Sequence, residues 1–348
     1  MEKEYDITIP RNVVVAKIVK RTQHPNADKL SVCEVDNGSE ILQIVCGAKN
    51  VYVGQYVALA CINAVLPFGR DGSTKIIESE IRGVKSQGML CSSTELGLPK
   101  LNDGILELDL SIGELVLGKE LYEYSVFHQT VLELGITPNR GDCLCVLGIA
   151  REIASVFNLI TKNIIANEPS IALGVGRFLQ VVPNGELHSS LLYRIIEVKD
   201  GYTPLLIALT LGLNGKYKQC HISNFAEYST YMTGVLFNIY PMDSQLISNN
   251  GTEAKLIIKT DENNLESVYA SIYDSKQDKE VACNKLTTIG TTTYNIEYRD
   301  YPRTFILEAS FIDSMIIANA TYKLDKTCFT QEILHKTIRG TNPDLEVV

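Results

Sequence analysis

The chain has 348 residues, a formal net charge of −9, and 45% hydrophobic and 21% charged residues. Because one hydrophobic core rarely serves a chain of this length, we expect roughly two or three domains of ordinary globular composition. The acidic balance repels phosphate at long range and excludes a non-specific nucleic-acid coat, so any RNA binding requires a local basic patch.

Cellular location and metal content are constrained by what the sequence lacks. No apolar run reaches the roughly 20 residues that cross a bilayer, and the opening residues MEKEYDITIP have neither the basic nor the apolar part of a secretion signal. The nine cysteines are scattered and include no C-x-x-C pair, which argues against a disulfide framework and a structural zinc. We therefore expect a cytoplasmic protein with no metal site and no membrane contact.

Residues 1–120 are predicted to form short strands. The strands are expected at residues 11–20, 30–36, 40–46 and 55–61, with a further pair around 75–82. Asn37-Gly38 is a strong hairpin signal between two of these runs. Several short strands without a long helix are typical of a small closed barrel. An oligonucleotide-binding barrel is the natural candidate, although the pattern leaves other small barrels open.

Residues 121–165 change character and are predicted to hold a helix. The turn-forming run Thr137 to Gly141 precedes Asp142, which we expect to cap the helix. Apolar residues then recur at helical spacing, so residues 143–158 are predicted to be an amphipathic helix whose apolar stripe packs into a core. Arg140 and Asp142 are expected to pair or cap, which gives them a structural role.

Residues 166–348 show a mixed pattern. Helices are expected at 204–212 and 313–323, and strands at 255–259, 268–273 and 304–308. The predicted fold class is therefore α+β and multidomain. It would consist of an oligonucleotide-binding barrel (1–120), a short helical segment (121–165) and a mixed α+β sheet domain (166–348).

Several motifs resemble one known family. HPNADKL (24–30), QIVCGAKNV (43–51) and IRGVKSQGMLCSSTELGL (81–98) follow, in order and spacing, the tRNA-binding barrel of phenylalanine–tRNA ligase β subunits. ITPNRGDCLCVLGIAREIA (136–154) is similar to the β-subunit segment after that barrel, which free-standing tRNA-binding barrels lack. The tail motifs ILEASFIDSMIIANATYKL (306–324) and KTIRGTNPDL (336–345) resemble the end of the family's B3/B4 editing-type domain.

The resemblance implies a component of an aminoacyl-tRNA synthetase. Its partners would be tRNA(Phe) and the ligase α subunit, in a heterotetramer of α and β subunits. The α subunit would use ATP and Mg²⁺ for charging, since no ATP site is recognisable in this chain, and no cofactor is expected on the chain itself.

Four cations in the barrel motifs are the expected tRNA contacts. These are Lys29, Lys49, Arg82 and Lys85. His24, a lone histidine beside a proline, has no second ligand nearby and is interpreted as part of a turn that Asn26 and Asp28 help to hold.

In the family, the second domain hydrolyses tRNA mischarged with tyrosine. The run TGVLFNIY (233–240) corresponds to the family's G-x-P-x-H motif, with Asn238 in place of the histidine. The editing-pocket candidates are Thr233, Gly234, Asn238 and Glu308. No catalytic residue is assigned.

Two alternatives stay open. The altered run at 233–240 also fits a free-standing, non-catalytic tRNA-binding module with a degenerate pocket. Full β subunits are longer at both ends, so the chain is expected to be either a fragment of one or a shortened relative.

Overall fold

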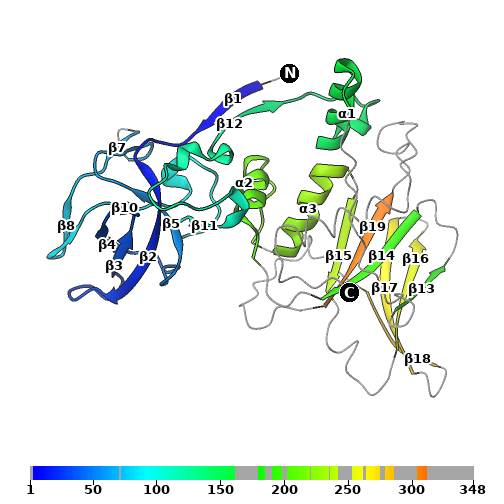
Figure 1. The fold of residues 1–348 in the computed structure, drawn as a ribbon. Helices are drawn as coiled ribbons and strands as arrows, with labels where there is room; N and C mark the ends of the chain where they lie inside the picture. Colours follow the sequence, from blue (N-terminus) through cyan, green and yellow to red (C-terminus); the bar gives the residue numbers. More distant parts are fainter. Residues whose placement is uncertain are drawn as a thin grey trace. The chain divides into compact units, whose positions relative to one another are not determined.

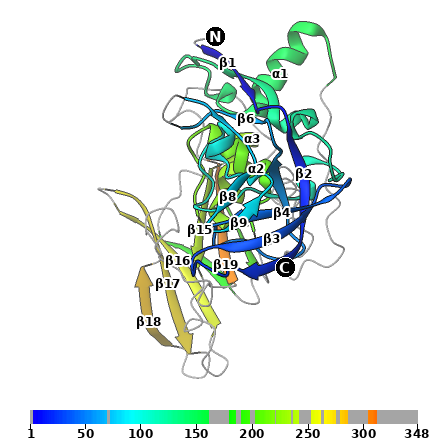
Figure 2. The same cartoon turned by 90° about the vertical axis from the view of Figure 1, so that its left-hand side faces the viewer.

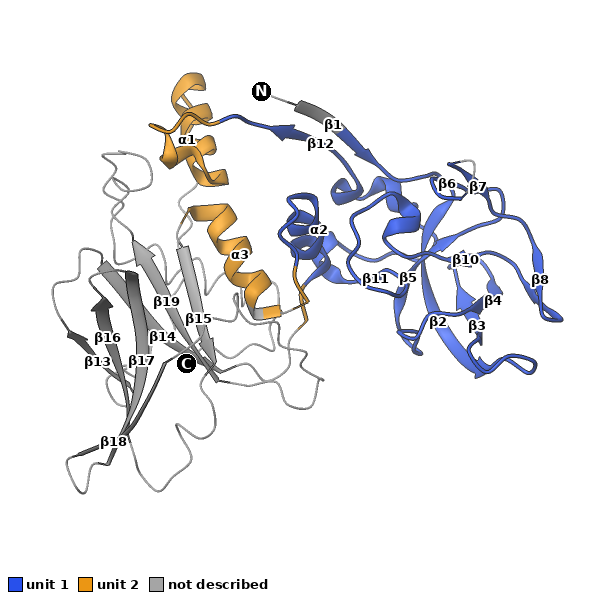
Figure 3. Ribbon diagram, turned by 180° about the vertical axis from the view of Figure 1, so that it is seen from behind, with its two compact units in different colours: residues 1–135, 204–217 blue, residues 136–203, 218–348 orange. Residues whose placement is uncertain are grey.

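The structure is a computed structural model with a mixed α+β fold (Figure 1). It describes residues 3–69, 72–160, 179–184, 190–197, 202–219, 221–234, 236–241, 253–261, 264–274, 279–285 and 304–311. The chain forms two compact units (Figure 3). Unit 1 comprises Met1–Gly135 and Pro204–Tyr217, and unit 2 comprises Ile136–Thr203 and Lys218–Val348. Among the described residues, no helix is long and apolar enough to cross a membrane.

The main sheet of unit 1 is antiparallel. Its strands are β2 (Val13–Gln23), β3 (Ser31–Asp36), β4 (Ile41–Cys46), β5 (Tyr56–Ala60), β10 (Met89–Leu90) and β11 (Glu107–Leu108). The order is β10-β5-β2-β3-β4, with β11 also pairing with β5. The strands predicted at 11–20, 30–36, 40–46 and 55–61 are thus confirmed. The predicted Asn37-Gly38 hairpin is also confirmed, because Asp36 and Ile41 pair directly across it.

The two central strands, β2 and β5, are buried on both faces. On β2, Val14 and Ile18 contribute to one apolar cluster, whereas Val13 and Val15 contribute to another. On β5, residues 57 and 59 belong to the first cluster and residues 58 and 60 to the second. Since successive side chains of a strand point to opposite faces, the sheet requires apolar cover on both sides. The β3–β4 hairpin supplies residues to the first cluster, and residues 91–127 supply many of those in the second.

A short segment connects the two edges of this sheet. The hairpin of β8 (Ser79–Ile81) and β9 (Val84–Ser86) precedes it, and the pair predicted around 75–82 therefore lies slightly later in the chain. The Gln87 amide donates to the Gln43 carbonyl of β4 at 2.9 Å, and Met89 then pairs with Ala60 of β5. At Gly88, where φ is +154°, a Cβ would lie 2.8 Å from the Ala60 carbonyl, so the crossing needs glycine.

Smaller elements complete unit 1. They are β6 (Val65–Leu66), β7 (Thr74–Lys75), β1 (Lys3–Thr8), β12 (His128–Glu133), η1 (Thr94–Leu96), η2 (Leu110–Ile112), η3 (Leu121–Glu123) and η4 (Ser125–Phe127). β6 pairs with β7, and β1 pairs with β12 in an antiparallel ribbon (Figure 1).

Helix α2 (Leu205–Leu213) belongs to unit 1, although the residues on either side of 204–217 belong to unit 2. The helix predicted at 204–212 is confirmed. Leu205, Ala208 and Leu209 join the second cluster, as expected for a helix that is apolar on nearly all sides. Its first amides are capped by η2, because the Leu205 amide donates to Asp109 Oδ2 at 2.8 Å and the Leu206 amide to Ser111 Oγ at 3.0 Å.

In the described part of unit 2, the helices are α1 (Val146–Phe157), α3 (His221–Thr233) and the short η5 (Gly141–Cys143). The predicted helix at 143–158 is confirmed, but the prediction that Asp142 caps it is wrong. Asp142 lies in η5, and Cys145 is the N-cap of α1, with Sγ accepting from the Gly148 amide at 3.3 Å. The expected core packing of the helix is also only partly right, because Ala154 is buried but Phe157 is 69% exposed. The described residues do not cover that side of α1.

The described residues of unit 2 form two larger sheets. One has the order β14 (Ser190–Glu197), β19 (Thr304–Phe311), β15 (Leu236–Pro241), and is antiparallel. The other has the order β13 (Leu179–Asn184), β16 (Glu253–Asp261), β17 (Asn264–Asp274), β18 (Lys279–Lys285), and only β13 and β16 are parallel. Figure 2 shows β16, β17 and β18 side by side. The strands predicted at 255–259, 268–273 and 304–308 lie in β16, β17 and β19. The helix predicted at 313–323 lies outside the described residues.

A buried asparagine forms hydrogen bonds with the residues on either side of segment 204–217, which contains α2. Asn224 is fully buried in α3, and its Nδ2 donates to Thr203 Oγ1 at 2.8 Å and to the Lys218 carbonyl at 2.7 Å. Its Oδ1 accepts from the Lys218 amide at 2.9 Å. Thr203 and Lys218 are the unit 2 residues on either side of 204–217, so one side chain fixes where the chain leaves the unit and where it returns.

The shared cap predicts the effect of removing the Asp109 carboxylate. Asp109→Ala should lower the free energy of unfolding by about 1–2 kcal/mol, since it removes the side-chain acceptor at the starts of both η2 and α2. Urea denaturation of the full chain measures this loss. Asp103→Ala, which removes an exposed carboxylate paired with Lys100, is the control and should leave stability unchanged. Equal stability of the two variants would contradict the role of the cap.

Candidate functional sites

His24 links two segments of unit 1. Its ring is buried, its Nδ1 accepts from the Asn26 amide at 3.0 Å, and its Nε2 lies 3.0 Å from the Ile81 carbonyl. Because Nδ1 accepts, the ring proton is on Nε2, which donates to Ile81. The interpretation of His24 as a turn residue is confirmed, and Asn26 helps to hold the turn.

The side-chain amide of Gln23 holds the loop that follows His24. Gln23 Nε2 lies within hydrogen-bond distance of three carbonyls, those of Ala27, Asp28 and Leu30, at 3.0, 2.9 and 3.2 Å. Sequence reasoning passed over Gln23, although it directly precedes the HPNADKL motif. The contacts of the Gln23 amide keep the loop compact, and the Lys29 side chain on this loop is exposed.

Arg82 lies at the tip of the β8–β9 hairpin in an unusual backbone conformation. Its φ is +50° and that of Gly83 is +85°, and Ile81 pairs with Val84 across them. Two successive positive φ values in a two-residue loop define a type I′ turn, in which asparagine and glycine are favoured. The Arg82 carbonyl accepts from Asn26 Nδ2 at 2.9 Å, so the loop after His24 supports this turn.

The four expected tRNA contacts come from three neighbouring segments, all exposed. Lys29 precedes β3 and Lys49 follows β4, at the end of the sheet where Ser31 pairs with Cys46. Arg82 and Lys85 belong to the adjoining hairpin, since Gln43 Nε2 of β4 donates to the Lys85 carbonyl at 2.9 Å. Lys85 pairs with Glu78 at 3.2 Å. Among the described residues, no ion pair is formed by Lys29, Lys49 or Arg82.

In unit 2, Arg140 ties the start of α1 to the preceding turn. Arg140 Nε and Nη2 donate to the two carboxylate oxygens of Asp142 at 3.0 and 2.9 Å, and Nη2 also lies 2.5 Å from Glu152 Oε1. These bonds hold the pKa of Asp142 below its usual value and raise the pKa of Arg140. Burial and the nearby Asp142 charge raise the pKa of the Cys143 thiol. The structural role expected of Arg140 and Asp142 is confirmed as pairing.

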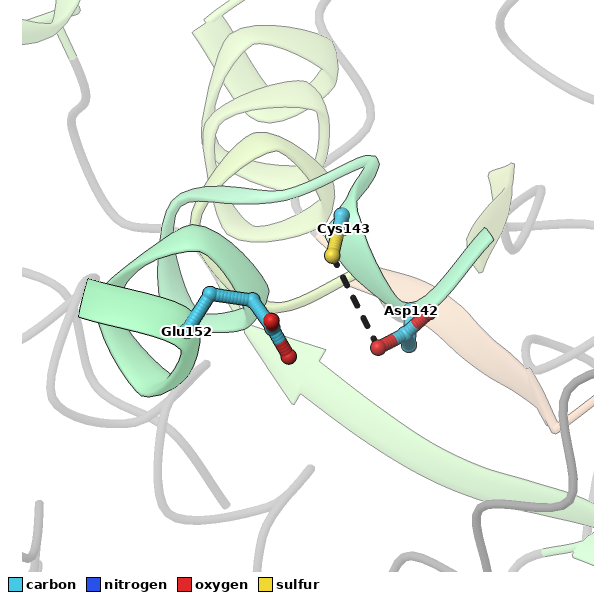
Figure 4. A group of neighbouring side chains, drawn as sticks. All are labelled: Asp142, Cys143 and Glu152. Atoms are coloured by element: carbon cyan, nitrogen blue, oxygen red, sulfur yellow. Dashed lines mark hydrogen bonds between the residues drawn. The ribbon is translucent and has the colours of Figure 1, made fainter. Parts of the chain in front are cut away.

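Potential metal ligands lie close together in the same place. Donor atoms of Asp142, Cys143 and Glu152 lie within 4.8 Å of one another (Figure 4). The Arg140 guanidinium already forms ion pairs with both carboxylates and donates to Cys143 Sγ at 3.0 Å. The three side chains are therefore already bonded within the protein, with Arg140 as their common cationic partner.

Thr233 and Gly234 shape the turn from α3 into β15. Thr233 is buried, and its Oγ1 donates to the Ser229 carbonyl of its own helix at 2.8 Å. Gly234 follows with φ +79°, and its amide donates to the Thr230 carbonyl at 2.7 Å. A Cβ at Gly234 would lie 3.2 Å from Cys145 Sγ, so glycine suits both the backbone and the space.

The other two editing-pocket candidates are brought together by strand register. Asn238 of β15 and Glu308 of β19 are direct partners across the antiparallel pair. Glu308 also pairs with Tyr193 of β14 on its other side, because β19 is the central strand. Direct partners share a face of the sheet. Tyr193 was not among the candidates from the sequence, because no local motif shows which residue of another strand is aligned with Glu308.

Close packing at the start of α1 predicts that a glycine-to-alanine substitution there lowers stability, although such a substitution usually stabilises a helix. Gly148→Ala should lower the free energy of unfolding by about 1–3 kcal/mol, although alanine normally favours a helix, because its Cβ would lie 1.8 Å from the Asp142 carbonyl oxygen. Chemical denaturation measures the change, with Ser155→Ala at an exposed position of the same helix as the control. A Gly148→Ala chain as stable as the wild type would contradict this packing.

Comparison with known proteins identifies relatives of this chain. A family model described as a putative tRNA binding domain matches residues 13–114. The phenylalanine–tRNA ligase β subunit of Helicobacter hepaticus is 44% identical over 350 residues, covering 99% of this chain and 42% of the relative. Those of Wolinella succinogenes and Helicobacter pylori are 43% and 44% identical, covering 98% and 97% of this chain and 42% and 41% of the relatives. Along nearly its whole length the chain is thus similar to phenylalanine–tRNA ligase β subunits, and it spans about two fifths of the length of these curated relatives.

Proposed function

We propose that this chain is the tRNA-binding part of a phenylalanine–tRNA ligase β subunit. The match of residues 13–114 to a tRNA-binding domain, within a chain related along its length to β subunits, is the observation that carries the proposal. The α subunit would bind ATP and Mg²⁺ and charge tRNA(Phe), in a heterotetramer of α and β subunits. This chain itself would need no cofactor for that role.

Unit 1 is the proposed tRNA-binding body, with the architecture of an oligonucleotide-binding barrel. The segment 84–90 supports a closed sheet, because it bonds to edge strand β4 and then continues as β10 beside β5. The basic segments around Lys29, Lys49 and Arg82 meet near β4. On a chain of net charge −9, such a local patch is where a phosphate backbone would bind.

The proposal predicts salt-dependent tRNA binding through this patch. In filter binding, the full 348-residue chain should bind a tRNA(Phe) transcript with an affinity that falls steeply as salt rises. Lys29→Ala with Lys85→Ala should weaken binding about tenfold or more and lower the salt slope by roughly 1–2.

A matched double variant provides the control for charge alone. Lys75→Ala with Lys100→Ala removes the same charge from exposed positions outside the three segments and should bind nearly as the wild type does. Failure of the wild-type chain to bind tRNA at low salt would refute the proposed function. Equal losses in both double variants would move the binding surface elsewhere.

We also propose that unit 2 is a B3/B4-type editing domain that hydrolyses tyrosine from mischarged tRNA(Phe). The register that pairs Asn238 of β15 with Glu308 of the central strand β19 supports this proposal, since it places these two positions opposite each other on one face of the sheet. Ester hydrolysis needs a positioned water and donors for the developing oxyanion. A site that hydrogen-bonds the extra phenolic hydroxyl would select tyrosine over phenylalanine.

The alternative is a binding-only module, which is favoured by Asn238 in place of the family's histidine. Deacylation of Tyr-tRNA(Phe) by the full chain separates the two. Editing predicts hydrolysis above the spontaneous rate, with Phe-tRNA(Phe) left intact, and a loss of about 10²-fold or more in Glu308→Gln. Glu280→Gln, on β18 of the other sheet, is the control and should retain activity. A wild-type rate equal to the spontaneous one would establish the binding-only module.

A further inference from the structure

Arg82 combines an unfavourable backbone conformation with an exposed, uncommitted side chain. Its φ of +50° is one that bulky residues rarely adopt, and the type I′ turn it begins is most readily formed by an Asn-Gly pair. Among the described residues, no carboxylate forms an ion pair with its guanidinium, and no hydrogen bond involves that group. The side chain therefore contributes nothing evident to the turn that it strains.

The backbone around Arg82 is held by the loop that carries Lys29. His24 Nε2 donates to the carbonyl before Arg82, and Asn26 Nδ2 donates to the Arg82 carbonyl itself. The same amide group of Asn26 lies 3.4 Å from where a Cβ of Gly83 would be. Residues 81–83 at the hairpin tip thus contact the loop that contains His24 and Asn26. These contacts fix the backbone of Arg82 and hence the direction in which its side chain projects.

The neighbouring charges are divided between paired and unpaired groups. Lys20 and Lys85 form ion pairs with Glu34 and Glu78, at 2.7 and 3.2 Å. Arg82 and Lys29, which lie on the two segments joined by Asn26, form none among the described residues. A guanidinium presents planar, paired donors that match the oxygens of a phosphate group.

We propose that the tip formed by residues 24–29 and 81–83 binds the phosphate backbone of a folded RNA. Arg82 is the contacting residue, and His24 and Asn26 are positioning residues. This inference rests on the proposed tRNA binding by unit 1 and adds which contact is preorganised. The strain at residue 82 is retained because it aims the guanidinium, and backbone strain of this kind is characteristic of binding sites.

The proposal predicts opposite changes in stability and affinity from one substitution. Arg82→Asn supplies the residue that the turn favours and removes the guanidinium, so the midpoint of thermal unfolding should stay the same or rise. Affinity of the full chain for a tRNA(Phe) transcript should nevertheless fall about tenfold, and the salt slope should fall by roughly 1. Lys100→Asn, which removes an exposed charge elsewhere in unit 1, should change neither.

A double-mutant cycle tests the positioning role. Asn26→Ala should weaken tRNA binding in the wild-type background and have no further effect in the Arg82→Asn background, because Asn26 acts on RNA only through Arg82. Additive losses in affinity would instead mean that Asn26 acts independently, which would overturn its assigned role.

The outcomes distinguish this inference from the function on which it rests. Wild-type affinity and salt slope in Arg82→Asn, or an equal loss in Lys100→Asn, would overturn the inference while tRNA binding by the chain stands. Absence of binding by the wild type would remove the proposed function, and the Arg82 contact with it.

Discussion

The burial of β2 and β5 on both faces is the constraint from which the rest of unit 1 follows. A strand with apolar residues at successive positions cannot present either face to water without losing hydrophobic stabilisation. Cover on one face comes from the β3–β4 hairpin, and cover on the other comes from residues 91–127 together with α2. Helix α2 is apolar on nearly all sides, so it is itself stable only when packed in this way. This shared need explains why a segment within the unit 2 sequence completes the core of unit 1.

The ends of the sheet are organised by polar side chains rather than by apolar packing. Buried polar groups must be hydrogen-bonded, and His24 meets that requirement with one backbone donor and one backbone acceptor. Gln23 is exposed, but its Nε2 lies within hydrogen-bond distance of three carbonyls of the following loop. Residues that resemble catalytic or metal-binding groups in the sequence are thereby used to hold loops. The exposed cations are left at defined places on a rigid frame.

In unit 2, side chains also hold a turn in place, but here the hydrogen bonds join charged groups. Arg140 gathers the carboxylates of Asp142 and Glu152 around one guanidinium and so fixes the turn before α1. Gly148 allows α1 to approach the Asp142 carbonyl, and Gly234 allows the α3–β15 turn to approach Cys145. These contacts set where β15 begins. The register of β15 with β19 then decides that Asn238 and Glu308 are partners.

The sequence by itself determined the features that depend on neighbours in the chain. Period-two alternation and Asn37-Gly38 predicted the β3–β4 hairpin, and helical spacing predicted α1, because these signals lie within a few residues. The motifs at 24–30, 43–51, 81–98 and 136–154 likewise indicated the family before any fold was known. The Asp142 cap was predicted wrongly because Asp142 lies in the separate short helix η5, where its carboxylate binds Arg140, and α1 begins later with Cys145 as its N-cap.

Only the tertiary structure decided what depends on distant segments. It assigned α2 to unit 1, paired Asn238 with Glu308, and joined Asn26 to Arg82. It also revealed the positive φ of Arg82, which is supported by a loop far away in the sequence. The physical reason is common to all of these: register, packing partners and supported backbone strain arise when separate segments meet, and no local propensity encodes which segments will do so.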